Sequence, residues 1–243
     1  MKVCSQARVA FYDLDGTLAA LNLVDAGIFV FSKLREWSNR VSYLTRLLRR
    51  LPRLYIAEKT DRALLNRAVF ETFKGVSRDR LRLIGEEYCE YVMACRLYPQ
   101  ARELIERNRA MGLKPVLVSG SPDFIVEPLA ARLGIEDFAA NRLKYHRGVA
   151  TGDLHEPVMA GSHKAEFCLQ YARARNIDLA DCWAYADSYH DLPFLFAVGH
   201  PVAVNPDRKL ESIARSQFWP IIYFDLDKQA SSLRVFARHL VGI

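Results

Sequence analysis

From Pro99 onward, short apolar runs alternate with segments of helical periodicity, and this alternation restricts the chain to a small set of folds. Short strands separated by helices are typical of βαβ units, whose strands form one parallel sheet. The sequence therefore predicts an α/β fold with a Rossmann-like parallel sheet. The predicted strands are residues 9–12, 115–118, 182–186, 202–204 and 221–224, the predicted helices of this part are residues 99–111, 122–133 and 164–175, and residues 143–154 are a predicted hairpin.

Residues 18–95 have a different pattern, because leucine and arginine recur at helical spacing and strand signals are few. Three or four helices fit this stretch, one of them beginning after Ser77. We therefore expect two units: an α/β core made of residues 1–17 and 96–243, and an inserted helical unit of residues 18–95.

The segment Asp13-Leu14-Asp15-Gly16-Thr17 directly follows the first predicted strand. Residues two apart in an extended chain point to the same side, so Asp13 and Asp15 can face one pocket. Two converging carboxylates need a cation between them or must share a proton. Ligation by oxygen alone suits Mg²⁺. The alternative is a solvated acidic turn that binds nothing.

Three further signals lie later in the chain. Ser119 and Gly120 separate a predicted strand from a helix that Ser121 is predicted to cap, where a hydroxyl and free backbone N–H groups form an anion site. Lys164 lies at a helix start, where the helix dipole disfavours a positive charge, and such conflicts tend to occur at functional sites. Asp187 and Asp191 follow another strand and can share one face of a helical turn. The structural alternatives are helix caps and an exposed lysine.

In open α/β sheets, ligands bind beyond the carboxyl ends of the strands. Three of the four signals directly follow a predicted strand, so their side chains are expected to line one crevice. Carboxylates, a lysine and a hydroxyl there would supply a metal holder, a nucleophile and a phosphate clamp. The sequence therefore predicts a phosphoryl-transfer site.

These motifs, in this order, resemble the haloacid dehalogenase superfamily of phosphatases. They are FYDLDGTL from Phe11, LVSGSP from Leu117, the lone Lys164 and YADSYHDLPFL from Tyr185. The resemblance extends from the first strand to about Pro206, and the SGSP and DSYHDLP details are similar to the phosphoserine-phosphatase-like branch, subclass IB. It implies that residues 18–95 form a helical C1 cap on a catalytic core.

The resemblance also implies a role for each motif residue. Asp13 is expected to attack phosphorus and become an aspartyl phosphate, while Asp15 protonates the leaving oxygen and then activates water. Ser119, Gly120 and Lys164 are expected to bind phosphate oxygens. The groups implied to hold Mg²⁺ are Asp13, the backbone carbonyl of Asp15, and Asp187, and the supporting residues are Thr17 and Asp191, the latter ordering the waters of the metal or Lys164.

The sequence leaves the phosphate ester open. A small phosphorylated metabolite, similar to phosphoserine or histidinol phosphate, is the first hypothesis, and a lipid phosphate similar to phosphatidylglycerophosphate is the second. Phosphoserine-cleaving members of the branch carry an acidic cap residue shortly after the first motif, and Asp25 is a candidate counterpart. A phosphotransferase would use the same residues. The long insertion and Asp15 disfavour a receiver domain, and the intact motifs disfavour a binding protein without activity.

The net charge of +6 favours anionic partners without choosing among metabolites, acidic lipids and nucleic acid. No nucleic-acid-binding motif is recognisable, so nucleic acid is not expected. The first half of residues 18–95 interleaves basic residues with leucines, which suits a solvated helix face or peripheral contact with an anionic membrane. Its basic residues are Lys33, Arg35, Arg40, Arg46, Arg49, Arg50 and Arg53.

The five cysteines are scattered and form no CxxC pair, which favours buried thiols in a reducing compartment. The N-terminal apolar run is too short for a signal peptide, and no stretch approaches the ~18 apolar residues of a transmembrane helix. We therefore expect a cytoplasmic protein. His190 is a further candidate for a substrate contact, and Asp225-Leu226-Asp227 is predicted to be a surface acidic pair.

Overall fold

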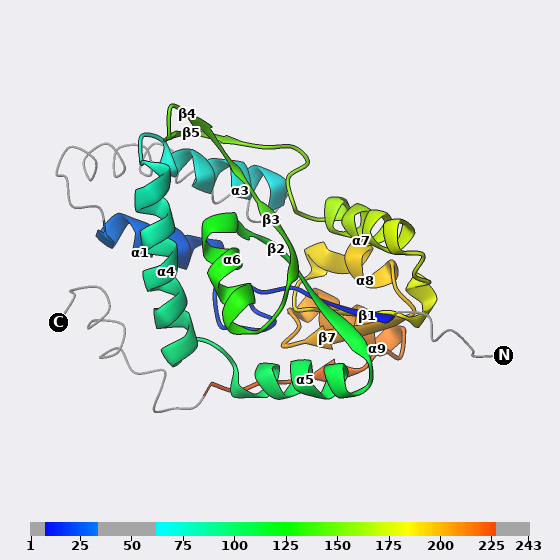
Figure 1. The fold of residues 1–243 in the computed structure, drawn as a ribbon. Coiled ribbons are helices and arrows are strands. Elements are labelled where there is room, and N and C mark those ends of the chain that lie inside the picture. Colours follow the sequence, from blue (N-terminus) through cyan, green and yellow to red (C-terminus); the bar gives the residue numbers. More distant parts are fainter. Residues whose placement is uncertain (1–7, 34–61, 227–243) are drawn as a thin grey trace.

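The computed structural model describes residues 8–33 and 62–226, and a parallel sheet crosses their centre (Figure 1). Its strands lie in the order β3-β2-β1-β6-β7-β8, and every neighbouring pair is parallel. The predicted α/β fold is therefore confirmed. The strands are β1 (Arg8–Tyr12), β2 (Leu113–Pro122), β3 (Asp137–Asn141), β6 (Trp183–Ala186), β7 (His200–Val204) and β8 (Ile221–Ile222).

Strand β1 lies in the interior of the sheet, with β2 on one side and β6 on the other. After β1, the chain forms β2 and β3 on one side of this strand. It then forms β6, β7 and β8 on the other side. In such a sheet, the strand at which the order reverses leaves a crevice at its carboxyl end, where ligands bind. The backbone N–H of Asp13 donates to the carbonyl oxygen of Tyr185 at 2.9 Å, so β1 and β6 end side by side there.

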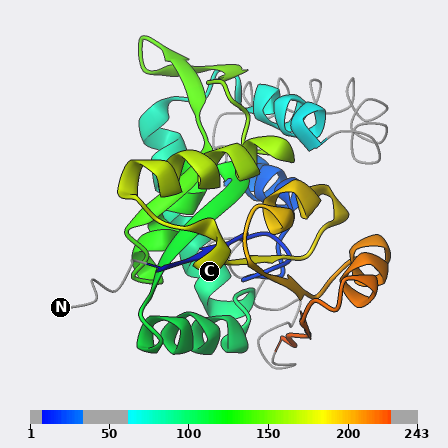
Figure 2. The same ribbon diagram turned by 90° about the vertical axis from the view of Figure 1, so that its right-hand side faces the viewer.

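Side chains that alternate along β1 divide the core into two layers, because successive strand residues point to opposite faces. Ala10 and Tyr12 belong to the cluster that includes α5 and α6, whereas Val9 and Phe11 belong to the cluster that includes α7, α8 and α9. The second layer lies toward the viewer in Figure 2, where α7 is the yellow-green helix. These helices are α5 (Pro99–Ala110), α6 (Asp123–Arg132), α7 (Ser162–Arg175), α8 (Leu192–Phe196) and α9 (Arg208–Ser216).

Three helices and a hairpin lie beyond the first layer. They are α1 (Leu23–Lys33), α3 (Arg62–Phe70), α4 (Arg78–Cys95), and the predicted hairpin, formed by β4 (Leu143–His146) and β5 (Val149–Leu154). The side chain of Ser77 accepts a hydrogen bond from the N–H of Arg80 and caps α4, as its position in the sequence suggests. Residues 34–61, which carry most of the arginine-rich stretch, lie outside the described residues.

Helix α4 approaches α6 closely at Gly85. A Cβ atom at this position would lie 1.9 Å from the carbonyl oxygen of Phe124, a distance that only glycine permits. The connection from β1 to α1 and the connection from α4 to α5 also run together. The N–H of Ala20 donates to Arg96 O at 2.8 Å, and the N–H of Tyr98 donates to Leu18 O at 3.0 Å.

One expectation about local structure, the cap at Ser121, is wrong, and one structural alternative, a helix capped by Asp187, is not observed. Strand β2 continues to Pro122 and α6 begins at Asp123, so Ser121 lies in the strand and does not cap the helix. Asp187 does not begin a helix either, because the turn Tyr189–Asp191 is capped by Ser188. Strand β3 is not apparent in the sequence, since Asp137-Phe-Ala-Ala-Asn141 contains no β-branched residue.

Within residues 8–33 and 62–226, no helix is long and apolar enough to cross a membrane. Cys89, Cys95, Cys168 and Cys182 are buried free thiols. Burial, which disfavours the thiolate, raises the pKa of each of them above the usual value. These four thiols are therefore buried, as the sequence predicts.

Candidate active site

Lys164 joins two aspartates beyond the carboxyl ends of β1 and β6. Its Nζ atom lies 2.8 Å from Asp13 Oδ1 and 2.8 Å from Asp191 Oδ1. Asp13 and Lys164 each expose 4% of their surface and Asp191 exposes 6%. A buried ammonium group is stable only when paired, and two carboxylates pair this one. The side chains of Asp13, Lys164 and Asp191 thus lie in contact, as the sequence motifs predict.

The position of Lys164 in the first turn of α7 explains the conflict noted in the sequence. Burial alone would lower the pKa of this lysine, but the carboxylates of Asp13 and Asp191 raise it above its usual value. The ammonium group therefore stays charged although it lies at the positive end of a helix dipole.

The carboxylates of Asp13, Asp187 and Asp191 form a compact group whose oxygen atoms lie within 4.8 Å of one another. Burial raises the pKa of Asp13 to about 7, with Lys164 opposing the rise and Asp191 adding to it. Burial also raises the pKa of Asp187 well above its usual range, and the charges of Asp13 and Asp191 raise it further. Three carboxylates against one ammonium group leave an excess of negative charge. This all-oxygen donor set fits Mg²⁺.

Asp15 lies beside this group and is held by two serines. Its Oδ2 accepts hydrogen bonds from Ser121 Oγ at 2.7 Å and from Ser119 Oγ at 3.3 Å. Burial raises the pKa of Asp15, and the hydrogen bond from Ser121 opposes the rise most strongly. Ser121 is thus a site residue that the sequence analysis missed. Its spacing of two from Ser119 in an extended strand could have revealed it, because such residues point to one side.

The rest of the first motif positions Asp187. Gly16 has a φ of +78°, and a Cβ atom there would lie 2.1 Å from Asp187 Oδ2. The hydroxyl of Thr17 donates to Asp187 Oδ1 at 3.4 Å. The turn after β1 can therefore receive the Asp187 carboxylate only with glycine at position 16.

A cavity of about 140 Å³ opens onto these groups. Gly120 lines it, and a Cβ atom at Gly120 would lie 3.1 Å from Asn66 Nδ2. Arg62 and Asn66, both from α3, also line the cavity, and the sequence analysis named neither of them. Asn66 is 95% buried, since it exposes only 5%. Among the described residues its side-chain amide has no hydrogen-bond partner, so it is available to a ligand.

Two weaker candidates lie away from this cavity. The carboxylate of Asp25 pairs with Arg96 at 3.2 Å and does not line the cavity, where Asn22 stands instead. The acidic counterpart at Asp25 stays a prediction. His190 is partly buried between the site aspartates but is not a lining residue, and burial lowers its pKa.

A family model described as haloacid dehalogenase-like hydrolase matches residues 10–195 of the chain. The phosphoserine phosphatase SerB1 of Mycobacterium tuberculosis (strain ATCC 25618 / H37Rv) is 31% identical over 175 residues, which are 72% of this chain and 57% of that protein. A phosphoserine phosphatase of Albidiferax ferrireducens is 26% identical over 214 residues, covering 86% of this chain and 84% of that protein. The chain thus spans little more than half of the length of the mycobacterial relative.

Solved structures of low identity share the fold. A Bordetella pertussis protein of unknown function has a TM-score of 0.76 and 25% identity, with 90% of this chain and 99% of that chain covered. A substrate-bound phosphoserine phosphatase has a TM-score of 0.66 and 19% identity, with 90% of this chain and 93% of that chain covered.

Proposed function

The chain belongs to the haloacid dehalogenase-like hydrolases, and from this membership we propose that it is a magnesium-dependent phosphatase that cleaves a small phosphomonoester through an aspartyl phosphate on Asp13. The observation that carries the proposal is the contact of Lys164 with both Asp13 and Asp191 beside Asp187. The relatives named phosphoserine phosphatase and histidinol-phosphatase support the same class of reaction.

Asp13 is the nucleophile of the proposed reaction. Its carboxylate attacks phosphorus, and the bond between phosphorus and the oxygen of the leaving alcohol breaks. Lys164 favours the charged form of the buried carboxylate and binds a phosphate oxygen beside it. Water then attacks the aspartyl phosphate, which releases inorganic phosphate and restores Asp13.

Asp15 acts as the acid and then as the base. Its raised pKa maintains a protonated fraction at higher pH than an exposed aspartate would, so that it can give a proton to the leaving oxygen. The resulting carboxylate takes a proton from the attacking water in the second step. Ser119 and Ser121 hold it in place. Ser119 and Gly120 also face the position proposed for the phosphate oxygens.

The residues proposed to hold Mg²⁺ are Asp13 and Asp187 through their side chains and Asp15 through its backbone carbonyl. When bound, the ion neutralises the negative charge that the phosphate and the clustered carboxylates bring together. Asp191 forms a second ion pair with Lys164 and so helps to hold it beside Asp13.

The cavity favours a small leaving group with an anionic part. Its volume of about 140 Å³ is below the usual range of about 300–1,000 Å³ for sites that enclose drug-sized ligands. Arg62 supplies a positive charge and Asn66 an unpaired amide. We infer that phosphoserine, whose carboxylate suits Arg62, fits better than histidinol phosphate, and that a lipid phosphate fits least.

The test is phosphate release by wild type, Asp13→Asn and the control Asp153→Asn, whose carboxylate is exposed on the hairpin. The substrates are 4-nitrophenyl phosphate, phosphoserine, histidinol phosphate and detergent-dispersed phosphatidylglycerophosphate, each with Mg²⁺ or with EDTA. We expect Mg²⁺-dependent turnover in wild type and control, with phosphoserine the best natural substrate, and none in Asp13→Asn. Equal turnover in Asp13→Asn would contradict the role of this residue. Phosphoryl transfer to an added alcohol would indicate a phosphotransferase.

A further inference from the structure

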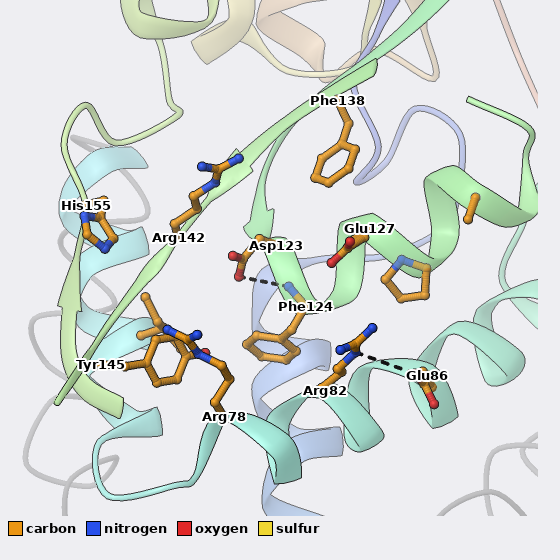
Figure 3. Close-up of a pocket in the computed structure, with 13 residues that line it drawn as sticks. Arg78, Arg82, Glu86, Asp123, Phe124, Glu127, Phe138, Arg142, Tyr145 and His155 are labelled. Carbon is orange, nitrogen blue, oxygen red and sulfur yellow. Dashed lines mark hydrogen bonds and ion pairs between the residues drawn. The ribbon is translucent and has the colours of Figure 1, made fainter. Parts of the chain in front are cut away.

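A second cavity, of about 560 Å³, lies between the first turns of α4 and α6 and the hairpin (Figure 3). None of its lining residues lines the active-site cavity. Its volume falls within the range of small-molecule sites, which are mostly apolar pockets with a few well-placed polar groups.

Two opposite charges of this groove, and the exposed Glu127 beside them, are in no ion pair among the described residues. Asp123 comes from the start of α6, and Arg142 from the connection between β3 and β4 (Figure 3). The Asp123 carboxylate accepts one hydrogen bond, from the N–H of Phe124 at 2.9 Å. Within the described parts of the chain, neither Asp123 nor Arg142 is in an ion pair. Burial raises the pKa of Asp123, and Arg142 opposes the rise from a distance too long for a salt bridge.

The other two arginines of the groove already have neighbours. The guanidinium carbon of Arg78 lies 4.4 Å from the centre of the Tyr145 ring, and Arg82 Nε lies 4.0 Å from Glu86 Oε1. Arg142 is therefore the arginine of the groove that remains for an anionic group, and Asp123 is the less exposed of its two unpaired carboxylates.

Aromatic rings line the rest of the groove. Phe124 exposes 7% of its surface and forms part of the core, and Phe138 and Tyr145 are half-buried against the same core. Figure 3 shows the Phe124 ring between Tyr145 on one side and Arg82 on the other. These rings offer apolar surface next to the two unpaired charges.

We propose that the groove binds a small zwitterion with an apolar side chain, of the α-amino acid class. Its carboxylate pairs with Arg142, its ammonium group with Asp123, and its side chain covers Phe124. A ligand with a single charge completes only one of these pairs. Without an ammonium group it leaves the half-buried Asp123 carboxylate unpaired, and without a carboxylate it gains no ion pair with the exposed Arg142. This inference does not rest on the phosphatase proposal, because the two cavities share no residue.

The test is calorimetric binding of three probes of similar shape to the full chain. L-Phenylalanine carries both charges, 3-phenylpropanoate lacks the ammonium group, and 2-phenylethylamine lacks the carboxylate. We expect phenylalanine to bind, and each probe with one charge to bind about fivefold more weakly or worse, the effect of losing a ~1 kcal/mol ion pair. Saturating inorganic phosphate, which is expected at the other cavity, should not displace phenylalanine.

Two variants test the two proposed ion pairs with the ligand one at a time. Asp123→Asn, which retains an acceptor for the Phe124 N–H, should abolish the preference for phenylalanine over 3-phenylpropanoate and leave its preference over 2-phenylethylamine. Arg142→Gln should do the reverse, and the exposed-site control Lys144→Gln should change neither. Such opposite changes cannot arise from general unfolding. Absence of phenylalanine binding at about 10 mM, equal binding of 3-phenylpropanoate by wild type, displacement by phosphate, or unchanged preferences in both variants would overturn the proposal.

Discussion

At the scale of single residues, the clustered aspartates of the active site carry more negative charge than Lys164 neutralises. Asp187 lies against Gly16 with little room and faces two other carboxylates, while Lys164 serves Asp13 and Asp191. The arrangement favours binding of a cation over the stability of the cation-free protein. It therefore makes stability and activity respond in opposite directions to some substitutions.

Replacement of Asp187 should stabilise the metal-free protein. A carboxyl group whose pKa is raised by folding, as at Asp187, destabilises the folded chain once the pH passes the unfolded value of about 3.9, and the effect grows until the folded pKa is reached. We expect Asp187→Asn to raise the melting temperature at pH 7 in EDTA by about 2–4 °C, the shift that ~1 kcal/mol causes in a chain of this size.

Differential scanning calorimetry measures this effect, with Asp153→Asn as the control that should show no shift. Addition of Mg²⁺ should raise the melting temperature of wild type more than that of Asp187→Asn. A lower melting temperature of the metal-free variant would show that the hydrogen bond from Thr17 outweighs the repulsion.

Lys164→Met should abolish most of the activity, because Asp13 and Asp191 lose their common partner. Loss of one electrostatic group in an enclosed site lowers kcat by about 10²–10³. Lys164→Arg should not restore activity, since the planar guanidinium cannot occupy the position of a compact ammonium group. Initial rates with 4-nitrophenyl phosphate test this, with Lys144→Met as control. A decrease below about tenfold would contradict the proposed role.

Ser121→Ala should alter the pH dependence of the rate. The hydrogen bond from Ser121 lowers the pKa of Asp15, so its loss lets that pKa rise. Because the acid form of Asp15 is proposed to protonate the leaving group, we expect the alkaline limb of kcat/KM for phosphoserine to move to higher pH. Ser216→Ala on α9, whose hydroxyl donates to its own helix, is the matched control. An unchanged alkaline limb would assign Ser121 a purely structural role.

At the scale of secondary-structure elements, close approach of α4 and α6 decides which substitutions the fold accepts. Gly85→Ala should destabilise the protein although alanine favours a helix, because its Cβ atom would collide with the Phe124 carbonyl. Overpacking costs about 1–3 kcal/mol, more than the gain in helix propensity. Leu83→Ala on the exposed side of α4 is the control. A higher melting temperature of Gly85→Ala would show that the helices can separate without cost.

Elements with strong local signals agree with the sequence to within a residue or two. Helix α5 begins at Pro99 and ends before Gly112, the residues that predicted its limits. Strand β3 was missed because its sequence is a poor strand former, and pairing with β2 holds it in the sheet. The end of β2 was missed because Ser119-Gly-Ser-Pro122 has the composition of a loop. In both cases long-range contacts override local preference.

At the scale of the whole molecule, the motif residues after β1 and β6 and in the last part of β2 could be placed together from sequence, because parallel strands end at one edge. Arg62 and Asn66 could not be placed, since their position depends on how α3 folds over the sheet. The division into a core and a cap of residues 18–95 stays a prediction, and so does the membrane contact, whose basic residues after Lys33 lie outside the described residues.

The connection from β1 to α1 lies beside the connection from α4 to α5, and this contact leads to one prediction about the whole molecule. Asp25 and Arg96 form a half-exposed ion pair at these connections. Such pairs contribute about 0.2–1 kcal/mol, so we expect Asp25→Asn to raise KM for phosphoserine by at most about fivefold and to leave kcat unchanged. Steady-state kinetics test this, and Arg215→Gln, which breaks a surface pair in α9, should change neither constant. A large fall in kcat would place Asp25 in the chemistry.

The place of β1 in the sheet also has a consequence for biosynthesis. This strand leaves the ribosome before the other strands of the sheet, yet its neighbours are β2 and β6, which begin at Leu113 and Trp183. Asp13 therefore emerges long before Lys164 and Asp191, the residues that surround it in the folded protein. Because pairings so distant in sequence form late, a nascent chain released before residue 191 should have most of the helices and no phosphatase activity.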